Sequence, residues 1–243
     1  MKERPVIFNG EMVRAILDSR KTQTRRVMKA QPKQHDHKNY DAPWACKSPN
    51  YYNTHEADWA CRYCGEGIGM DGQSVYRCPF GQVGDRLWVR ETFAILGNED
   101  GCPIDWDGNL IKGDEKHAAR IYKASCWQEP GNYGLWSIPD RDTQYEGAWR
   151  PSIHMPRWAS RITLEITAVR VERLNDISEE DAKAEGVAPS QHIITPPEAL
   201  YRVGFLKLWQ SIYGEKSWSA NPWVWVIEFR RVGDCAREVD REA

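Results

Sequence analysis

Lys21 and Thr24 are the first residues of this chain whose types and spacing could do chemistry. They lie in the segment Arg20-Lys21-Thr22-Gln23-Thr24-Arg25-Arg26, where an ammonium and a hydroxyl fall within one turn or loop of each other. A lysine that its surroundings desolvate can activate a threonine oxygen as a nucleophile. The plainer alternative is a solvated cluster of charges at the exit of a helix, with Thr24 facing a strand.

The same segment also fits contacts to nucleic-acid phosphates. Residues 20–33 hold six basic side chains and no acidic one, although the whole chain has a net charge of −2. Arginines and lysines beside Gln and Thr suit phosphate groups of RNA or DNA. The residues that we expect to bind substrate or nucleic acid are Arg20, Arg25, Arg26 and Lys29.

The cysteines form a second group with possible chemistry. Cys61 and Cys64 make a C-x-x-C pair, and Cys46 and Cys78 flank the pair at separations of 15 and 14 positions. Four thiolates at this spacing could hold a structural zinc ion, with His35, His37 or His55 as substitute ligands. The alternative is that these are unpaired loop cysteines. An odd total of 7 cysteines argues against a disulfide framework.

The elements that must position these residues begin at the N-terminus. An extended run over residues 5–8 precedes Asn9, which is a good helix N-cap, and residues 11–17 carry apolar side chains at helical spacing. We expect this helix to end near Asp18-Ser19, directly before Lys21. A turn and a strand follow at residues 84–93, and another strand is expected around residues 120–123.

The C-terminal third has the clearest periodicity. Apolar side chains alternate over residues 162–171 with a phase slip near Thr167-Ala168, which predicts a strand with a β-bulge. Residues 178–186 predict a short helix with Ser178 as N-cap and a glycine stop. A longer helix is expected from Thr195-Pro196 to Gly214, with Leu200, Val203, Leu206, Trp209 and Ile212 facing inward, and residues 223–229 predict an apolar closing strand.

Composition indicates a globular protein of one domain with insertions. The chain has 243 residues, of which 41% are hydrophobic and 28% charged, so it resembles neither a disordered tail nor a polycation. Since it holds no run of about 18 apolar residues and no apolar signal-peptide core at its start, we expect a cytoplasmic protein without a membrane partner. Residues 31–78 and 97–150 lack helical or strand periodicity over most of their length and are expected to be insertions, the first an inserted loop or a zinc-binding subdomain.

Three segments in order resemble the ASCH family, whose members are PUA-like β-barrels linked to RNA binding. Residues 18–26 are similar to its G-x-K-x-x-T-x-R signature with Ser19 in place of the usual glycine, residues 84–89 to its G-D-x-L strand entry, and residues 177–187 to its later helix. The resemblance covers about residues 1–30, 79–93 and 150–232, and it is strongest to long ASCH proteins of phages and prophages.

The resemblance implies an α+β fold, a PUA-like (ASCH) β-barrel with flanking helices and two long insertions. Some small bacterial members are N4-acetylcytidine amidohydrolases, which implies a Thr24 nucleophile, a Lys21 activator and a Glu185 acid/base, with no cofactor required for catalysis. The implied partner is a modified nucleoside or single-stranded RNA or DNA. A non-catalytic RNA-binding module, with Glu185 only structural, is the alternative, and a ribonuclease comes third.

Overall fold

The structure is a computed structural model, and it describes residues 1–29, 31, 51–55, 58–61, 76–129, 132–134, 148–192 and 194–232. Its contacts divide the chain into two compact units. The first unit comprises Met1–Lys2, Ser19–Arg86 and Glu165–Arg230, and the second comprises Glu3–Asp18, Leu87–Leu164 and Arg231–Ala243.

Among the described residues, the first unit holds most or all of six strands and three α-helices: β2 (Gln23–Val27), β3 (Tyr51–His55), β4 (Asp58–Cys61), β5 (Tyr76–Arg77), β11 (Thr163–Arg173), β12 (Trp223–Arg231), α2 (Glu179–Ala184), α3 (Leu200–Tyr213) and α4 (Lys216–Ser219). The second unit holds β1 (Glu3–Ile7), α1 (Gly10–Leu17), β6 (Arg86–Arg90), β7 (Phe93–Ile95), β8 (Arg120–Tyr122), β9 (Trp127–Glu129) and β10 (Asn132–Gly134). Short 3-10 helices are η1 (Glu115–His117), η2 (Lys123–Ser125), η3 (Ser152–His154), η4 (Arg157–Ala159), η5 (Leu174–Asp176) and η6 (Pro197–Ala199).

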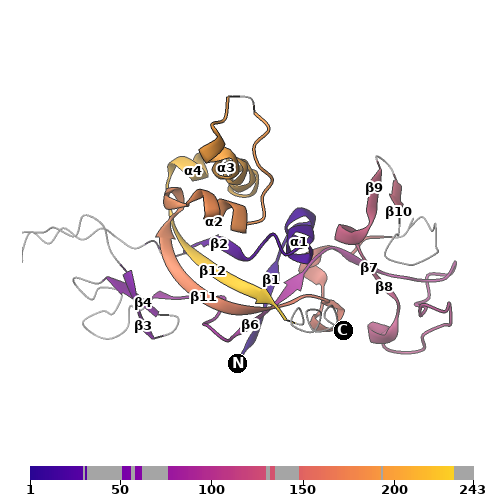
Figure 1. The fold of residues 1–243 in the computed structure, drawn as a ribbon. Helices are drawn as coiled ribbons and strands as arrows, with labels where there is room; N and C mark the ends of the chain where they lie inside the picture. The colour runs from indigo at the N-terminus through magenta and orange to yellow at the C-terminus, as the bar shows by residue number, and fades with distance from the viewer. Residues whose placement is uncertain are drawn as a thin grey trace, which may run out of the picture. The chain divides into compact units, whose positions relative to one another are not determined.

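The largest sheet has five strands in the order β1-β6-β11-β12-β2 (Figure 1). With its helices and its smaller sheets the chain has an α+β fold, as the sequence predicts. The order runs from one edge strand, β1, to another, β2, so among the described residues the sheet does not close into a barrel. No helix in the described ranges is long and apolar enough to cross a membrane.

The core of the first unit lies between the sheet and the helices α2 and α3. Its buried residues are Leu174, Ile177, Ala182, Phe205, Trp209, Val224 and Val226. Successive side chains of a strand point to opposite faces, so Val224 and Val226 of β12 share the face that α2 and α3 cover. β12 pairs antiparallel with β2, which places Arg25 opposite Val226 and therefore on this same face.

The predicted helix starts are confirmed where a capping side chain marks them. Asn9 Oδ1 accepts a hydrogen bond from the Met12 N–H at the start of α1, and Ser178 Oγ accepts one from the Asp181 N–H at the start of α2. Gly186 follows Glu185, the C-cap of α2, and has a φ of 77°, a left-handed value that favours glycine.

The start of the next helix differs from the prediction. α3 begins at Leu200 and not at Thr195-Pro196. Pro196 is extended, with a ψ of 148°, because the ring of the following Pro197 disfavours the helical region for the residue before it. The predicted inward position of Ile212 is also wrong, since this side chain is 48% exposed in the last turn of α3.

The strands follow their predicted patterns. In β11 the buried positions change phase between Ile166 and Val169, as the predicted bulge requires. β6, β8 and β12 lie where the sequence predicts strands. The described part of residues 31–78 contains a three-stranded antiparallel sheet of β3, β4 and β5, which the sequence pattern did not indicate.

Candidate active site

Lys21 and Glu185 meet where the start of β2 lies beside the end of α2. The two residues form an isolated antiparallel bridge, and the N–H of Thr22, the residue after Lys21, donates to the Ala184 carbonyl at 2.9 Å. The Thr22 carbonyl in turn accepts from the Phe229 N–H of β12 at 2.8 Å. Backbone hydrogen bonds on both sides therefore fix this stretch of chain and aim the Lys21 side chain at α2.

The Lys21 ammonium makes a short ion pair in the interior. Its Nζ lies 2.7 Å from Glu185 Oε2 and also donates to the Glu185 backbone carbonyl at 2.9 Å. The side chains of Lys21 and Glu185 are 0% and 2% exposed. Removing two charges from water costs several kcal/mol per ion before their attraction and further hydrogen bonds offset it. Such a pair contributes little net stability, and its position calls for a functional explanation.

Burial also changes the proton affinity of the lysine. Desolvation is the largest influence and lowers the pKa of Lys21 below its ordinary value, although the charge and hydrogen bond of Glu185 act in the opposite direction. A neutral lysine amine is therefore easier to form here than on the surface. A lysine of lowered pKa beside a carboxylate is a pair that can exchange protons with a substrate.

Arg25 joins Glu185 to two further carboxylates. Its Nη1 lies 3.4 Å from Glu185 Oε1, and its Nη2 lies 2.9 Å from both Glu172 Oε2 and Asp181 Oδ2. The Arg25 side chain is 0% exposed. Both oxygens of the Glu185 carboxylate are thus held by cations, which fixes its orientation.

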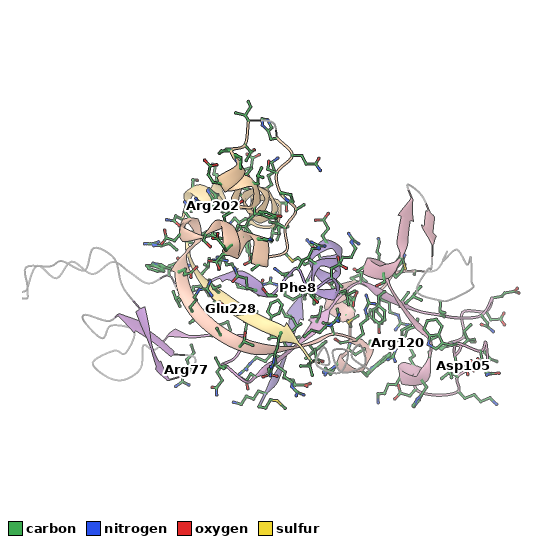
Figure 2. All side chains as sticks on the ribbon, in the orientation of Figure 1. Phe8, Arg77, Asp105, Arg120, Arg202 and Glu228 are labelled. Atoms are coloured by element: carbon green, nitrogen blue, oxygen red, sulfur yellow. The ribbon has the colours of Figure 1, made fainter. Side chains whose placement is uncertain are left out.

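An outer layer of side chains completes this network. Gln23 Nε2 donates to the Asp181 backbone carbonyl and to Oδ1, and Arg170 forms ion pairs with Asp181, with Glu172 and with Glu228. Glu228 lies on β12 and is labelled in Figure 2. Burial alone would raise the pKa of Asp181, but the charges of Arg25 and Arg170 and the hydrogen bond from Gln23 outweigh it, so the pKa lies below its usual value.

Thr24 is buried, at 2% exposure, but it lies on the other face of β2 from Arg25. Its partner in the register is Ile227, whose neighbour Val226 belongs to the core under α2 and α3. Because side chains alternate along both strands, Gln23 and Arg25 face α2 and Thr24 faces away from it. The structure brings Lys21 and Glu185 together and does not place Thr24 on their side of the strand.

The predicted substrate-binding cations divide into two groups. Arg25 is committed to carboxylates, as described above. Arg20 is exposed and donates to the Gly186 carbonyl at 3.1 Å, Lys29 is exposed, and the half-buried Arg26 lies 6.0 Å from the centre of the Phe80 ring. Arg20, Arg26 and Lys29 are therefore placed where they can meet a ligand from solvent, whereas Arg25 holds the site together.

The predicted zinc ligands fall mostly beyond what the structure describes. Cys46 and Cys64 lie outside the described residues, and Cys61 is described only as a backbone position of β4. Cys78 is buried. The described residues hold no group of three or more His, Cys, Asp or Glu side chains that could bind a metal ion. The zinc site stays a prediction.

Sequence reasoning missed the carboxylates and the arginine around Glu185. Asp181 lies four residues before Glu185, a spacing that puts two side chains on one face of a helix, so this signal was available. Arg170 and Glu172 alternate on β11 and share a face in the same way. Neither spacing shows which side chains from other elements these residues contact.

Comparisons with known proteins add no family to this description. No protein-family model, no curated protein and no solved structure matches the chain. The class that fold and site define is therefore an α+β protein in which an arginine-held glutamate binds a buried lysine at the edge of a five-stranded sheet.

Proposed function

We propose that this protein is a hydrolase that removes an N4-acyl group from cytidine or from a related modified base, in a fold of the PUA-like ASCH type. The observation that carries the proposal is the 2.7 Å contact between Lys21 Nζ and Glu185 Oε2, both buried. The ASCH resemblance pairs these same two residues in catalysis, although they lie 164 positions apart in the chain. The substrate would be a modified nucleoside of the cytoplasm.

The proposed chemistry is an acyl transfer in two steps. The Thr24 hydroxyl attacks the acyl carbonyl, and its proton passes to the neutral Lys21 amine. Lys21 hands this proton to the Glu185 carboxylate, which delivers it to the departing amino group of the base. Water then hydrolyses the threonine ester and releases the acid. Desolvation lowers the pKa of Lys21, which favours the amine form that the first step requires.

The position of the Thr24 hydroxyl sets the strictest geometric requirement of this mechanism. The β2 alternation directs its hydroxyl away from the Glu185 side, so the substrate-bound protein must bring that hydroxyl and the Lys21 amine to one reacting carbonyl. Substitution of Thr24 is therefore the sharpest test of the enzymatic proposal.

The experiment is hydrolysis of N4-acetylcytidine by purified protein, followed by release of cytidine and acetate. Thr24→Ala and Lys21→Ala should each lose most of the activity, whereas Thr22→Ala, a matched change at an exposed position, should keep it. The rate should rise with pH as Lys21 loses its proton. A folded wild-type protein without turnover, or a Thr24→Ala variant of unchanged rate, contradicts the proposal.

A second candidate is a non-catalytic RNA-binding module. It is favoured by the orientation of Thr24 and by the complete pairing of Glu185 with Lys21 and Arg25, which is how a purely structural network would look. In this case the exposed Arg20 and Lys29 contact phosphates, and affinity for single-stranded RNA falls steeply with salt. The double change Arg20→Gln with Lys29→Gln should weaken binding, while Lys207→Gln on α3 should not. Cleavage of the RNA would instead identify a ribonuclease.

A further inference from the structure

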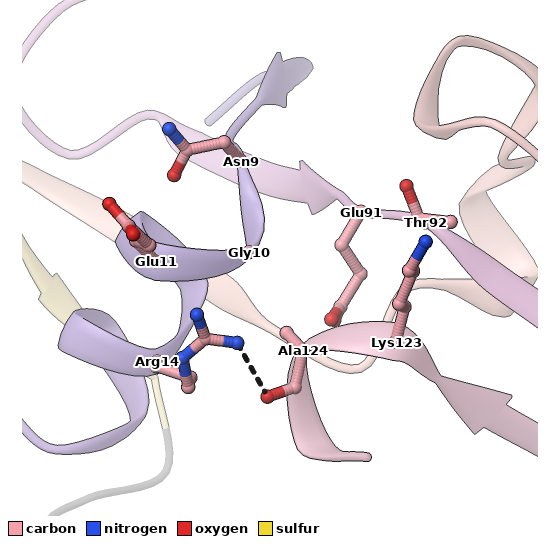
Figure 3. Close-up of a pocket in the computed structure, with 8 residues that line it drawn as sticks. All are labelled: Asn9, Gly10, Glu11, Arg14, Glu91, Thr92, Lys123 and Ala124. Atoms are coloured by element: carbon pink, nitrogen blue, oxygen red, sulfur yellow. Dashed lines mark hydrogen bonds between the residues drawn. The ribbon is translucent and has the colours of Figure 1, made fainter. Parts of the chain in front are cut away.

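The second unit contains a cavity that the proposed chemistry does not use. It has a volume of about 450 Å³ and lies between the start of α1, the segment after β6 and the start of η2 (Figure 3). A volume of this size is within the range of small-molecule sites, which is roughly 300–1,000 Å³. Its walls are polar and charged, so an apolar ligand does not fit it.

Two cations from different elements line the cavity. Lys123 lies with the Thr92 hydroxyl on one wall, and Arg14 projects from α1 on another (Figure 3). Arg14 Nη1 donates to the Ala124 carbonyl at 3.4 Å, a long hydrogen bond that leaves most of the guanidinium donors for other acceptors. The Lys123 N–H donates to the Thr92 carbonyl at 3.0 Å, which fixes these two positions together.

The buried acid of the cavity is already neutralised. Glu91 is 2% exposed, and its two oxygens accept from Arg161 Nε and Nη2 at 2.9 and 3.0 Å. This fork-to-fork pair cancels the carboxylate charge. Glu11 is exposed in the first turn of α1 and is therefore screened by water. Arg14 and Lys123 are the two cationic side chains among the residues that line the cavity.

The start of α1 adds backbone donors to the same wall. The first N–H groups of a helix have no partner within it, and the Asn9 side chain takes up that of Met12. The backbone N–H groups of Gly10 and Glu11 thus remain for a ligand or water. Gly10 lines the cavity and has no side chain that would cover these N–H groups. A helix start of this kind favours negative charge.

We propose that this cavity binds the phosphate group of a nucleotide or of a nucleic acid strand. Arg14, Lys123 and the Thr92 hydroxyl supply charged and neutral donors from different directions, which suits a tetrahedral anion with oxygens on all sides. The cavity shares no residue with the Lys21–Glu185 pair, and all its lining residues belong to the second unit. Phosphate binding here can hold whether or not the chain hydrolyses an acylated base.

The test is calorimetric titration of the whole protein at low ionic strength with three probes: inorganic phosphate, cytidine 5′-monophosphate, and a short single-stranded RNA without terminal phosphates. Lys123→Gln should weaken phosphate binding about tenfold, the expected loss of one charge-assisted hydrogen bond. Lys112→Gln removes the same charge from an exposed position of the same unit and should change nothing.

Gly10→Ala is a variant that keeps every charge. A Cβ at this position would lie 3.6 Å from Arg14 Nη1, an ordinary contact, so the fold tolerates it while the methyl group narrows the cavity beside the guanidinium. We expect Gly10→Ala to bind phosphate more weakly than wild type and to unfold at the same temperature.

The comparison of probes identifies the source of the phosphate. If cytidine 5′-monophosphate binds more tightly than the RNA, the ligand is a free phosphate monoester. If the RNA binds more tightly, the ligand is a nucleic acid strand. Absence of phosphate binding by wild-type protein, or an equal loss in Lys112→Gln, overturns the proposal.

Discussion

At the scale of single residues, the Lys21–Glu185 pair shows how a buried charge depends on its partner. Neither side chain has access to bulk water, so each is tolerable only while the other is present. Arg25 also relies on Glu185 for part of its compensation, through the 3.4 Å contact to Oε1. Removing the carboxylate therefore leaves two cations partly uncompensated in the interior.

We predict that Glu185→Gln lowers the free energy of unfolding by about 3–5 kcal/mol, the usual effect of breaking a buried ion pair from one side. The double variant Lys21→Met with Glu185→Leu should be more stable than Glu185→Gln alone, because no unpaired ammonium remains. Urea-induced unfolding measures the free energy of unfolding of both variants.

A matched control is the surface pair of Arg230 and Glu165, whose atoms lie 3.0 Å apart with side chains 62% and 29% exposed. Glu165→Gln should cost less than about 1 kcal/mol, since exposed ion pairs contribute little. If Glu185→Gln unfolds at the same urea concentration as wild type, the pair is not buried as described.

At the scale of elements, the position of α3 depends on one glycine. A Cβ at Gly204 would lie 2.3 Å from the carbonyl oxygen of Ala188, a backbone atom that has no freedom to rotate away. α3 can therefore approach the segment after α2 only because residue 204 has no side chain. This close approach keeps α2, and with it Asp181, packed over the core of the first unit.

We predict that Gly204→Ala lowers the free energy of unfolding by about 1–3 kcal/mol, the cost of overpacking, although alanine favours helices more than glycine does. Gly10→Ala is the control, a glycine-to-alanine change in a helix where the added carbon meets only an ordinary contact. Thermal unfolding of both variants gives the comparison. Equal midpoints for Gly204→Ala and wild type would mean that α3 sits farther from Ala188.

The elements were predictable where a local signal defines them, and the site was predictable only in part. Ser178 marks the start of α2 by a local capping bond, whereas the later start of α3 depends on Pro197, which keeps Pro196 extended. The face on which Thr24 lies depends on where β2 begins and on its register with β12. The partners of Arg25 come from residues about 150 positions away, and no spacing along the chain encodes such a meeting.

At the scale of the whole molecule, the chain builds two compact units from interleaved segments. The described strands β3, β4 and β5 of the first insertion pair with one another in their own three-stranded sheet. A sheet this small has little apolar area to bury, so a crosslink within the insertion would stabilise it.

We predict one zinc ion per chain, bound by Cys46, Cys61, Cys64 and Cys78. Mass spectrometry of untagged protein should find a zinc content near one, and Cys61→Ser should make residues 31–78 sensitive to protease while the remaining fold survives. Cys102→Ser, at an exposed cysteine outside the insertion, is the control. A zinc content near zero contradicts the site.

The long separation between Lys21 and Glu185 also sets the order of events during synthesis. The two residues are 164 positions apart, so at about 5–20 residues per second the ribosome adds Glu185 roughly 8–30 s after Lys21. For this interval Lys21 has no carboxylate from α2 to bind, and β12, which holds Thr22 from the other side, is made later still. A nascent chain thus carries Lys21 before its ion pair with Glu185 can form. Chains that stop before α2 cannot bury the Lys21 ammonium against the Glu185 carboxylate and cannot perform the proposed hydrolysis.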